Sequence, residues 1–552
     1  SKIAGFSSRR ETSASEQSPE SSTIWPMSWL LHLPRSEMEI LNKLPEFMKT
    51  RTLSISLIAV VIVVLSVFAV PKDKPKPGVK EGAIRVLFLG HESEHHNSNK
   101  YYPMLAKGLG RDAIYFDYVT NVEEAFGDAA YLNKFDAVLL YANHGTITPK
   151  QWKNLKGFVE SGGGFVPVHC ASWCFGNEPG FDKLVGGRFD SHKTGTFTAQ
   201  VVDGKHPAMD GVQEFEAWDE TYKHKNHNEK DRSVLMVREI AGKDDNITEP
   251  EPWTWVRTQG KGRVFYTASG HDERVWKQPA FHQLLKAGIL WSVGDARKRS
   301  YEKFIAGRTP LKYEKRDNIA NYENRPEPLP YQFPLSAEDS MDYTQAPVGF
   351  RLELFASEPD IINPIGLAWD ERGRLWVAET VDYPNEITAD RKGNDTIKIL
   401  EDSDGDGKCD KVTVFADGLN IPTSLTFSRG GIIVAHAPDF LFLKDTDGDD
   451  KADVREVLTT GWGIGDTHAG PSNLRYGFDN WIWGSVGYSS FNGTVGGEQK
   501  RFGSGVFRMK PDGSQLEFMH QFNNNTWGVG FNSAGDVFGS TANNNPSFFC
   551  GI

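Results

Sequence analysis

The amino-acid sequence predicts a doubly wound α/β domain followed by an all-β propeller of about four blades, which leaves the propeller ring incomplete. The α/β prediction comes from a strand, loop and helix pattern that repeats from Ile84. Several of its strands are near-continuous apolar runs, as found in parallel sheets covered on both faces. The propeller prediction comes from strand and turn segments that recur after Gly349 at the spacing of propeller blades.

Length, charge and cysteine content limit the classes of function. A chain of 552 residues is long enough for several domains. Its formal net charge of −12 argues against nonspecific binding to nucleic acid, which needs a basic surface, and favours a carbohydrate or another small molecule as the partner. Four cysteines make neither a disulfide framework nor a structural zinc site, so Cys170 and Cys174 are expected to be buried thiols.

The N-terminal region predicts export. Residues 1–47 are rich in Ser, Glu and Arg and are expected to be disordered, or to lie upstream of a true start at Met48. Residues 48–70 form a basic start followed by an apolar run, which is typical of a signal peptide or an uncleaved transmembrane anchor; a core helix is the alternative. Residues 71–83 are a linker. We therefore expect a periplasmic or extracellular protein, anchored to the cytoplasmic membrane if the segment is not cleaved.

Residues 84–297 carry the predicted α/β domain, and residues 298–345, rich in charge, Pro and Tyr, are predicted to form a linker. Thr148 and Pro149 predict a helix start, with a capping hydroxyl before a proline at the first helical position. Another helix is predicted over Pro279–Ser292. The predicted strands are Arg85–Leu89, Ile114–Val119, Ala137–Tyr141, Phe165–His169, Trp253–Arg257 and Arg263–Ala268.

Residues 346–552 carry the propeller prediction. Each repeat gives a strand, a tight turn and a second strand, and equivalent positions recur roughly every 50–60 residues, near the length of a propeller blade. The repeats are Asn363–Glu379, Ile421–Ala437, Gly470–Val486 and Asn525–Thr541.

Histidines follow the strands of the predicted parallel sheet. Loops at the carboxyl ends of such strands converge at one edge, where ligands bind. A single histidine is more often structural, but several at one edge favour a ligand or acid–base site, because imidazole serves both roles near neutral pH. The histidines are His91, His95, His96, His144, His169 and His271. The predicted substrate-binding residues at this edge are His91, His144, Glu220, Tyr222 and Asp272.

The segment Gly162–Ser172 predicts a buried strand that runs into a sharp turn carrying His169. It resembles the elbow of class I glutamine amidotransferases, in which a cysteine nucleophile occupies the turn. Here His169 takes the matching position and Cys170 follows one residue late. A strained elbow favours small residues two places either side of its nucleophile, and Cys170 has Val168 there, so the sequence disfavours thiol catalysis.

Four segments of the α/β part together resemble the ThuA-like, trehalose-utilisation family. They are Arg85–Gly90, Gly162–Ser172 (GGGFVPVHCAS), Asp219–His224 (DETYKH) and Gly262–Trp276 (GRVFYTASGHDERVW). The resemblance covers residues 84–296 and implies a flavodoxin-like, amidotransferase-like domain linked to sugar metabolism, without the usual cysteine nucleophile. It makes His169 and His271 the expected catalytic residues, His271 by its position after the last strand.

Two acidic loops in the propeller region share one template. Carboxylates at alternating positions can converge on a hard cation, and glycine permits the tight turn. Neither loop is an EF-hand, since Thr413 stands where the first should close with glutamate and Asp450 takes the glycine position of the second. Solvated hairpin turns are the alternative to calcium binding. The predicted calcium ligands are Asp402, Asp404, Asp406, Asp410, Asp445, Asp447, Asp449 and Asp453.

The segment Thr467–Leu474 (THAGPSNL), together with Asn363–Glu379, resembles the propellers of soluble quinoprotein glucose dehydrogenases. It is most similar to a bacterial membrane-bound dehydrogenase family that often follows a ThuA-like domain. The resemblance covers residues 346–552 and implies pyrroloquinoline quinone as the hydride acceptor, His468 as the catalytic base that takes a proton from a sugar hydroxyl, and an electron-acceptor protein as a partner. The chain has no CxxCH haem-attachment motif.

These features lead to one expected function and one alternative. The expected function is an exported protein of carbohydrate metabolism that oxidises or otherwise processes a sugar, in the manner of a quinone-dependent sugar dehydrogenase. The alternative is a noncatalytic module, made of a calcium-stiffened propeller and a degenerate α/β domain, that binds glycans or proteins. Hydrolase or amidotransferase activity of the α/β domain is disfavoured by the turn at His169.

Overall fold

The computed structural model describes residues 82–551, apart from residues 241–242, 244, 320, 322–328, 385–386, 389 and 544–546. Residues 1–81 lie outside the described residues. They include the segment predicted to be disordered, the predicted export segment and most of the first predicted linker. Within the described part of the chain, no helix combines the length and the apolar character needed to cross a bilayer.

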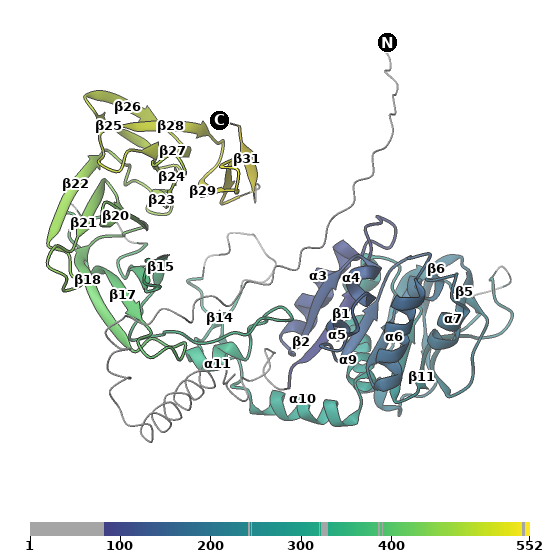
Figure 1. The fold of residues 1–552 in the computed structure, drawn as a ribbon. Coiled ribbons are helices and arrows are strands. Elements are labelled where there is room, and N and C mark those ends of the chain that lie inside the picture. The colour runs from purple at the N-terminus through teal and green to yellow at the C-terminus, as the bar shows by residue number, and fades with distance from the viewer. Residues whose placement is uncertain are drawn as a thin grey trace, which may run out of the picture. The chain divides into compact units, whose positions relative to one another are not determined.

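A mixed eight-stranded sheet forms the centre of the α/β part (Figure 1). Its strands are β1 (Ile84–Leu89), β2 (Ile114–Val119), β3 (Ala137–Leu140), β4 (Gly164–Pro167), β7 (Gln200–Val201), β10 (Arg232–Arg238), β11 (Glu251–Gln259) and β12 (Gly262–Thr267). The order is β2-β1-β3-β4-β12-β11-β10-β7, and the first five strands are parallel. This confirms the flavodoxin-like prediction. The predicted strand Trp253–Arg257 is part of β11, which continues the sheet in the antiparallel direction.

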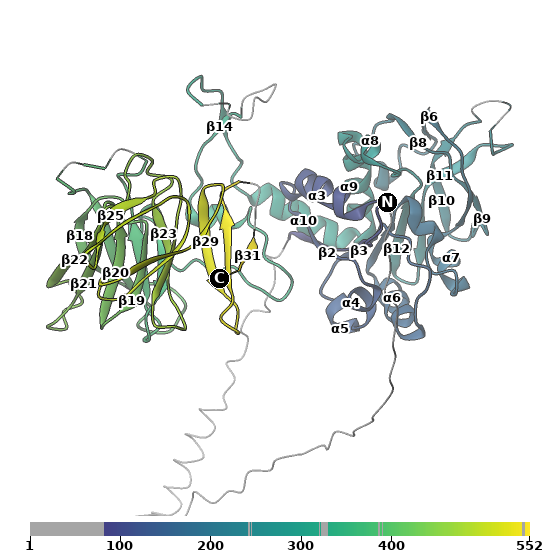
Figure 2. The ribbon, with the colours of Figure 1, turned by 90° about the horizontal axis from the view of Figure 1, so that it is seen from above.

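Helices cover both faces of this sheet, as its crossover connections require (Figure 2). They are α3 (Ser98–Gly110), α4 (Val122–Phe126), α5 (Ala129–Leu132), α6 (Pro149–Ser161), α7 (Pro179–Val185), α8 (Glu273–Trp276) and α9 (Pro279–Ser292). On one face α3 contacts α9, and on the other α6 contacts α4 and α5. Helix α6 begins with the predicted capping hydroxyl of Thr148 and Pro149 in its first turn. Helix α9 has the predicted bounds.

The region after the sheet is more ordered than the predicted linker 298–345. Helix α10 (Asp295–Gly307) fills its first part, and short elements follow: β13 (Tyr313–Glu314), β14 (Tyr331–Gln332) and α11 (Ala337–Met341). Tyr301 of α10 is buried, and its hydroxyl donates to the Asp112 carbonyl at 2.8 Å. Because only a narrow face of α10 is apolar, its many charged residues concealed the helix in the sequence.

Four antiparallel sheets form the propeller part, as predicted. Their strands are β15 (Pro364–Trp369), β16 (Leu375–Glu379), β17 (Asp395–Glu401) and β18 (Lys411–Leu419); β19 (Ser424–Ser428), β20 (Gly431–His436), β21 (Asp439–Lys444) and β22 (Val454–Thr460); β23 (Pro471–Tyr476), β24 (Ile482–Val486), β27 (Gly505–Met509) and β28 (Leu516–Gln521); and β29 (Thr526–Phe531), β30 (Val537–Thr541) and β31 (Phe548–Cys550). A hairpin of β25 (Phe491–Val495) and β26 (Glu498–Phe502) is inserted in the third sheet. Each predicted repeat gives the first two strands of one sheet.

The blades pack side by side through their first strands. β15 contacts β19, β19 contacts β23, and β23 contacts β29, so these strands line the inside of the arc seen in Figure 1. Apolar clusters fill the spaces between successive blades; one of them joins Trp376 of the first blade to Leu425 of the second. Burial between sheets, rather than helix packing, therefore holds this part together.

Candidate active site

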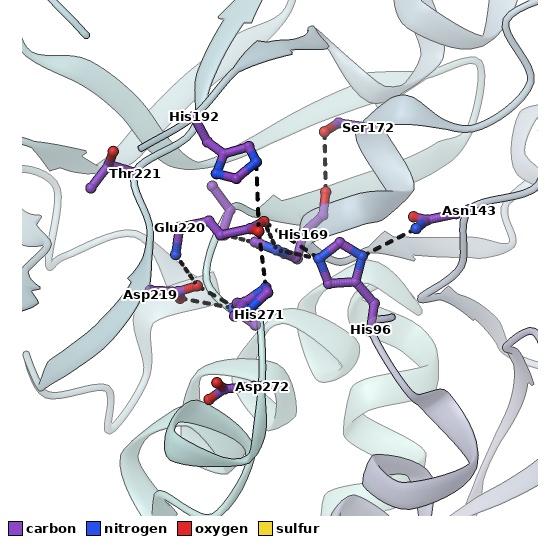
Figure 3. A network of polar contacts seen from close by, with 12 residues as sticks. His96, Asn143, His169, Ser172, His192, Asp219, Glu220, Thr221, His271 and Asp272 are labelled. Carbon is purple, nitrogen blue, oxygen red and sulfur yellow. Dashed lines mark hydrogen bonds and ion pairs between the residues drawn. The ribbon is translucent and has the colours of Figure 1, made fainter. Parts of the chain in front are cut away.

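Loops from four parallel strands bring polar side chains together at one edge of the sheet. His96 follows β1, Asn143 follows β3, His169 follows β4 and His271 follows β12. Glu220 comes from elsewhere: it ends β8 (Glu216–Glu220), which pairs with β6 (Thr194–Thr198) outside the main sheet. The structure thus brings together histidines that lie far apart in the sequence, around one carboxylate (Figure 3).

Glu220 is the centre of the cluster. Its Oε2 atom lies 3.1 Å from His169 Nε2 and 3.4 Å from His96 Nε2. Its Oε1 atom lies 3.2 Å from His271 Nδ1 and 3.6 Å from His192 Nε2. The Nε2 atoms of His96 and His169 are 3.2 Å apart. One buried carboxylate therefore faces four imidazole rings.

The backbone at two of these histidines is in the left-handed region. His96 has φ 55° and His169 has φ 49°, values that are uncommon for residues with a side chain. The neighbouring Gly270 has φ 139°, and a Cβ atom there would lie 3.2 Å from His169 Cβ, so glycine is required for the close approach. Strained backbone of this kind concentrates at functional sites. The left-handed turn falls on His169, the position to which the sequence assigned the elbow.

The orientation of His169 is fixed on both sides of its ring. Its Nδ1 atom lies 2.6 Å from the Ala268 carbonyl oxygen, which can only accept, so Nδ1 donates. Tyr222 stacks on the ring with 4.2 Å between centroids. The second nitrogen, Nε2, therefore points at Glu220.

A second buried carboxylate, Asp219, positions the loop that carries His271. Its oxygens accept hydrogen bonds from the backbone N–H groups of Glu220, Gly270 and His271 at 2.8, 3.0 and 3.1 Å. Burial raises the pKa of the Asp219 carboxyl. Asp219 thus joins β8 to the loop after β12 without facing the imidazole cluster itself.

Burial and the Glu220 charge shift the pKa values in opposite directions. Burial lowers the pKa of His96 to about 3, in spite of its contact with Glu220. Burial also acts to lower the pKa of His271, but the neighbouring Glu220 carboxylate outweighs it and the pKa is raised. For Glu220 itself, burial is opposed by the neighbouring imidazole groups of His169, His271 and His96, which hold its pKa below the usual range.

A pocket of about 260 Å³ opens beside the cluster. Its lining combines aromatic and polar side chains: His95, His96, Asn143, Trp173, Phe189, His192, Glu220 and Tyr222. Sequence reasoning assigned no role to Trp173, Phe189, His192 or Asn143. Of these, Trp173 had a usable signal, since it directly follows the predicted elbow. His192 lies in the turn between β5 (Arg188–Ser191) and β6, where no motif marks it.

Three residues predicted to bind substrate make other contacts. His91 Nε2 lies 2.9 Å from the His96 carbonyl oxygen, and His144 Nε2 lies 2.9 Å from the Gly90 carbonyl oxygen. These contacts hold the loop that presents His96. Asp272 caps α8 and accepts from Arg274. Glu220 and Tyr222, by contrast, line the pocket.

The cysteine next to His169 is inaccessible. Cys170 and Cys174 are buried, and burial raises the pKa of the Cys170 thiol well above its ordinary value. We therefore predict that, in the native chain, a thiol reagent such as Ellman's reagent reacts with the partly exposed Cys409 and not with Cys170. Labelling followed by peptide mass spectrometry measures this, with guanidinium-unfolded protein as the control. Rapid modification of native Cys170 would restore thiol catalysis as a hypothesis.

In the propeller part, the predicted base His468 is exposed and paired with a carboxylate. Its Nδ1 atom lies 3.2 Å from Asp466 Oδ1, and the Tyr383 ring packs edge-on at 5.0 Å between centroids. A carboxylate in this position orients an imidazole for proton transfer.

Each acidic loop brings three of its four predicted ligands together. The groups are Asp402, Asp404 and Asp410, and Asp445, Asp447 and Asp453, with carboxylate oxygens within 4.8 Å of one another. Asp406 and Asp449 fall outside these groups, and each accepts a hydrogen bond from the backbone N–H two residues later.

Two family models match the chain. Residues 85–292 match the model described as Trehalose utilisation (ThuA), and residues 336–550 match one described as a Domain of unknown function (DUF7133). No curated protein matches the sequence.

Solved structures similar to this chain include two putative ThuA-like proteins. The one from Parabacteroides merdae is 19% identical, with 38% of this chain and 90% of that chain covered and a TM-score of 0.34. The one from Bacteroides uniformis is 20% identical, with 40% and 94% covered and a TM-score of 0.33. The PQQ domain of pyranose dehydrogenase from Coprinopsis cinerea is 15% identical, with 34% and 48% covered and a TM-score of 0.25. From the family model and the fold, residues 85–292 form a ThuA-like domain of the trehalose-utilisation family, which a four-blade β-propeller region follows in the chain.

Proposed function

We propose that the ThuA-like domain binds a sugar in the pocket beside Glu220 and carries out an acid–base step on one of its hydroxyl or carbonyl groups. The observation that carries the proposal is the composition of this pocket, in which aromatic rings stand beside imidazole and carboxylate groups. A pyranose has the same two kinds of surface, because its C–H faces are apolar and its rim carries polar hydroxyl groups. The volume of about 260 Å³ suits one sugar unit rather than a long oligosaccharide.

The aromatic side of the pocket supplies an apolar surface. Trp173 is 43% exposed, which is unusual for a side chain of its size, and it lines the pocket. The Phe189 and Tyr222 rings are 4.6 Å apart and continue this surface. Apolar area of this kind supports binding, while a few polar groups fix orientation.

The polar side supplies groups that transfer protons. Imidazole and carboxylate side chains are the commonest general acids and bases, and Glu220 holds several imidazoles within hydrogen-bonding reach. Asn143 Nδ2 lies 3.1 Å from His96 Nδ1 and fixes that ring. A link to sugars is also supported by the family description, Trehalose utilisation.

The proposal is tested by incubating the purified full chain with trehalose and other glucose disaccharides. Saturation-transfer proton NMR measures sugar binding, and NMR of the reaction products measures turnover. We expect Trp173→Ala to weaken binding roughly tenfold, which corresponds to about 1.4 kcal/mol. Trp369→Ala, at an exposed tryptophan of the propeller part, is the matched control and should bind as the wild type does. Failure of the wild-type chain to contact any of these sugars contradicts the proposal. Binding without turnover favours the noncatalytic glycan-binding alternative.

A second candidate function, sugar oxidation in the propeller, is favoured by the Asp466–His468 pair. We propose that Asp466 orients His468, which takes a proton from a sugar hydroxyl. Pyrroloquinoline quinone, when bound, supplies a hydride acceptor. The same samples can be assayed for sugar oxidation by adding pyrroloquinoline quinone and a redox dye and measuring reduction of the dye. Reduction that His468→Gln abolishes supports this function, and no reduction by the wild type contradicts it.

A further inference from the structure

We propose that the ThuA-like domain binds one divalent transition-metal ion through His96, His169, Glu220 and His271. The inference rests on the site of the proposed function and adds a cofactor to it. These side chains each offer one ligand atom, and the atoms lie within 4.8 Å of one another. Three of the atoms are imidazole nitrogens and the fourth is a carboxylate oxygen.

The separations between the ligand atoms match a coordination sphere. Metal–ligand bonds of about 2.0–2.2 Å place the atoms of a tetrahedral site roughly 3.3–3.6 Å apart. Glu220 Oε2 lies 3.1 Å from His169 Nε2 and 3.4 Å from His96 Nε2, and the other carboxylate oxygen, Oε1, lies 3.2 Å from His271 Nδ1. The Nε2 atoms of His96 and His169 are 3.2 Å apart. Because one ligand atom from each residue lies within 4.8 Å of all the others, the atoms form one group instead of separate pairs.

The cluster has more acceptors than donors. Because His169 donates from Nδ1 to the Ala268 carbonyl, the Nε2 atom of a neutral His169 directs a lone pair at both Glu220 and His96 Nε2. His271 Nδ1 is buried and makes no well-directed hydrogen bond to any described atom, although it lies 3.2 Å from Glu220. Buried polar atoms normally find partners. A cation at their common centre would serve all of these lone pairs at once.

The surroundings of the rings are those of metal ligands. A ligating histidine usually contacts a carbonyl or another polar group through its other nitrogen, which fixes the ring. His169 has this contact with the Ala268 carbonyl at 2.6 Å. His96 Nδ1 lies 3.1 Å from Asn143 Nδ2, and a flip of that amide would turn its oxygen toward the ring to accept from Nδ1 of a metal-bound His96. The left-handed backbone of His96 and His169 shows that the fold holds both rings in place against local preference.

The donor set selects the class of metal. Three imidazoles with one carboxylate suit Zn²⁺, Mn²⁺, Fe²⁺, Co²⁺ or Ni²⁺, whereas Ca²⁺ and Mg²⁺ prefer oxygen ligands. His96 and Glu220 also line the pocket, so an ion between them would be within reach of a bound sugar. Such an ion polarises a carbonyl group or lowers the pKa of a bound hydroxyl group.

Cobalt titration of the chelator-treated full chain tests the proposal. Excess calcium is kept present so that the oxygen-only loops of the propeller do not take up cobalt. We expect the visible absorption of Co²⁺ bound by nitrogen ligands to saturate at one equivalent, and Zn²⁺ to displace it. Replacing a group that contacts a metal ligand typically weakens metal binding about 10–100-fold, and we expect Asn143→Ala to fall within this range. Glu220→Gln and His169→Asn each replace a proposed ligand, so they should weaken cobalt binding by more than this. Glu216→Gln, an exposed carboxylate on the same strand, is the matched control.

The outcomes separate this proposal from the proposed function. No cobalt absorption in the wild-type chain, or equal binding by wild type and Glu220→Gln, overturns the metal site; circular dichroism confirms that each variant is folded. Sugar binding that survives removal of all metal while cobalt fails to bind leaves the proposed function standing alone. Cobalt binding without any sugar binding supports the metal site and contradicts the function.

Discussion

Replacing Glu220 by glutamine is expected to lower the rate of sugar processing by about 10²–10⁴-fold, the usual contribution of a positioned acid–base group. Glu220 is the one carboxylate that faces His96, His169 and His271 together, so no other described group can take its place in the cluster. The fold should survive, because the amide has the shape of the carboxylate and its NH₂ group can donate to the His169 Nε2 lone pair.

The measurement is the initial rate on whichever disaccharide the wild-type chain converts, together with the melting temperature of each variant. Glu216→Gln lies four residues earlier on β8 and is exposed, so it should leave both quantities unchanged. A Glu220→Gln variant with full activity, or a Glu216→Gln variant that is equally impaired, would contradict the assignment of Glu220 to the site.

The α/β core was predictable because its strands are buried on both faces. Near-continuous apolar runs predicted β1, β2, β3, β4 and β12 within about two residues at either end, as expected for strands covered by helices. The short strands between Arg188 and Arg238 were missed. They mix exposed and buried positions, so neither alternation nor an apolar run marks them.

The site was only partly predictable. Sheet topology indicated the edge of the sheet at which the site lies, but not that Glu220 is the residue at its centre. Topology places the loops after β1, β3, β4 and β12 at one edge, and this indicated His96, His169 and His271 as candidates. Glu220 lies on the two-stranded sheet β6–β8 outside the main sheet, and its central position depends on long-range pairing that one sequence does not encode in any local pattern. The same holds for the pocket residue Phe189, whose neighbours come from distant segments.

The family resemblance and the backbone conformation both identify His169 as the residue in the sharp turn. The resemblance to the amidotransferase elbow placed the sharp turn at His169, and Val168, two residues before Cys170, disfavoured thiol catalysis. In the structure His169 takes the left-handed conformation, and Cys170 is enclosed in the following 3-10 helix, His169–Trp173. A buried imidazole that faces Glu220 thus occupies the turn at which the class I glutamine amidotransferases it resembles carry a cysteine, which favours acid–base or metal chemistry over acyl transfer at this edge.

Calcium is expected to stabilise the propeller part through its two acidic loops. Three carboxylates of each loop lie within 4.8 Å of one another, so they repel one another until a divalent cation neutralises them. Backbone N–H groups already order the loops: Gly405 donates to Asp402 and Gly448 donates to Asp445, both at 2.7 Å. The Gly448 hydrogen bond holds the pKa of Asp445 below its usual value, so this ligand is ionised at neutral pH.

A free calcium concentration about a hundredfold above the dissociation constant adds roughly 2.7 kcal/mol to the free energy of unfolding. For a domain of this size that gain raises the melting temperature by roughly 5–11 °C. Differential scanning calorimetry of the full chain with and without calcium measures the shift. Asp402→Ala combined with Asp445→Ala should abolish it, because both residues belong to the converging groups, whereas Asp512→Ala, in an acidic turn outside both loops, should retain it. Melting curves that coincide with and without calcium would make both loops ordinary hairpin turns, whose carboxylates are held only by their own backbone hydrogen bonds.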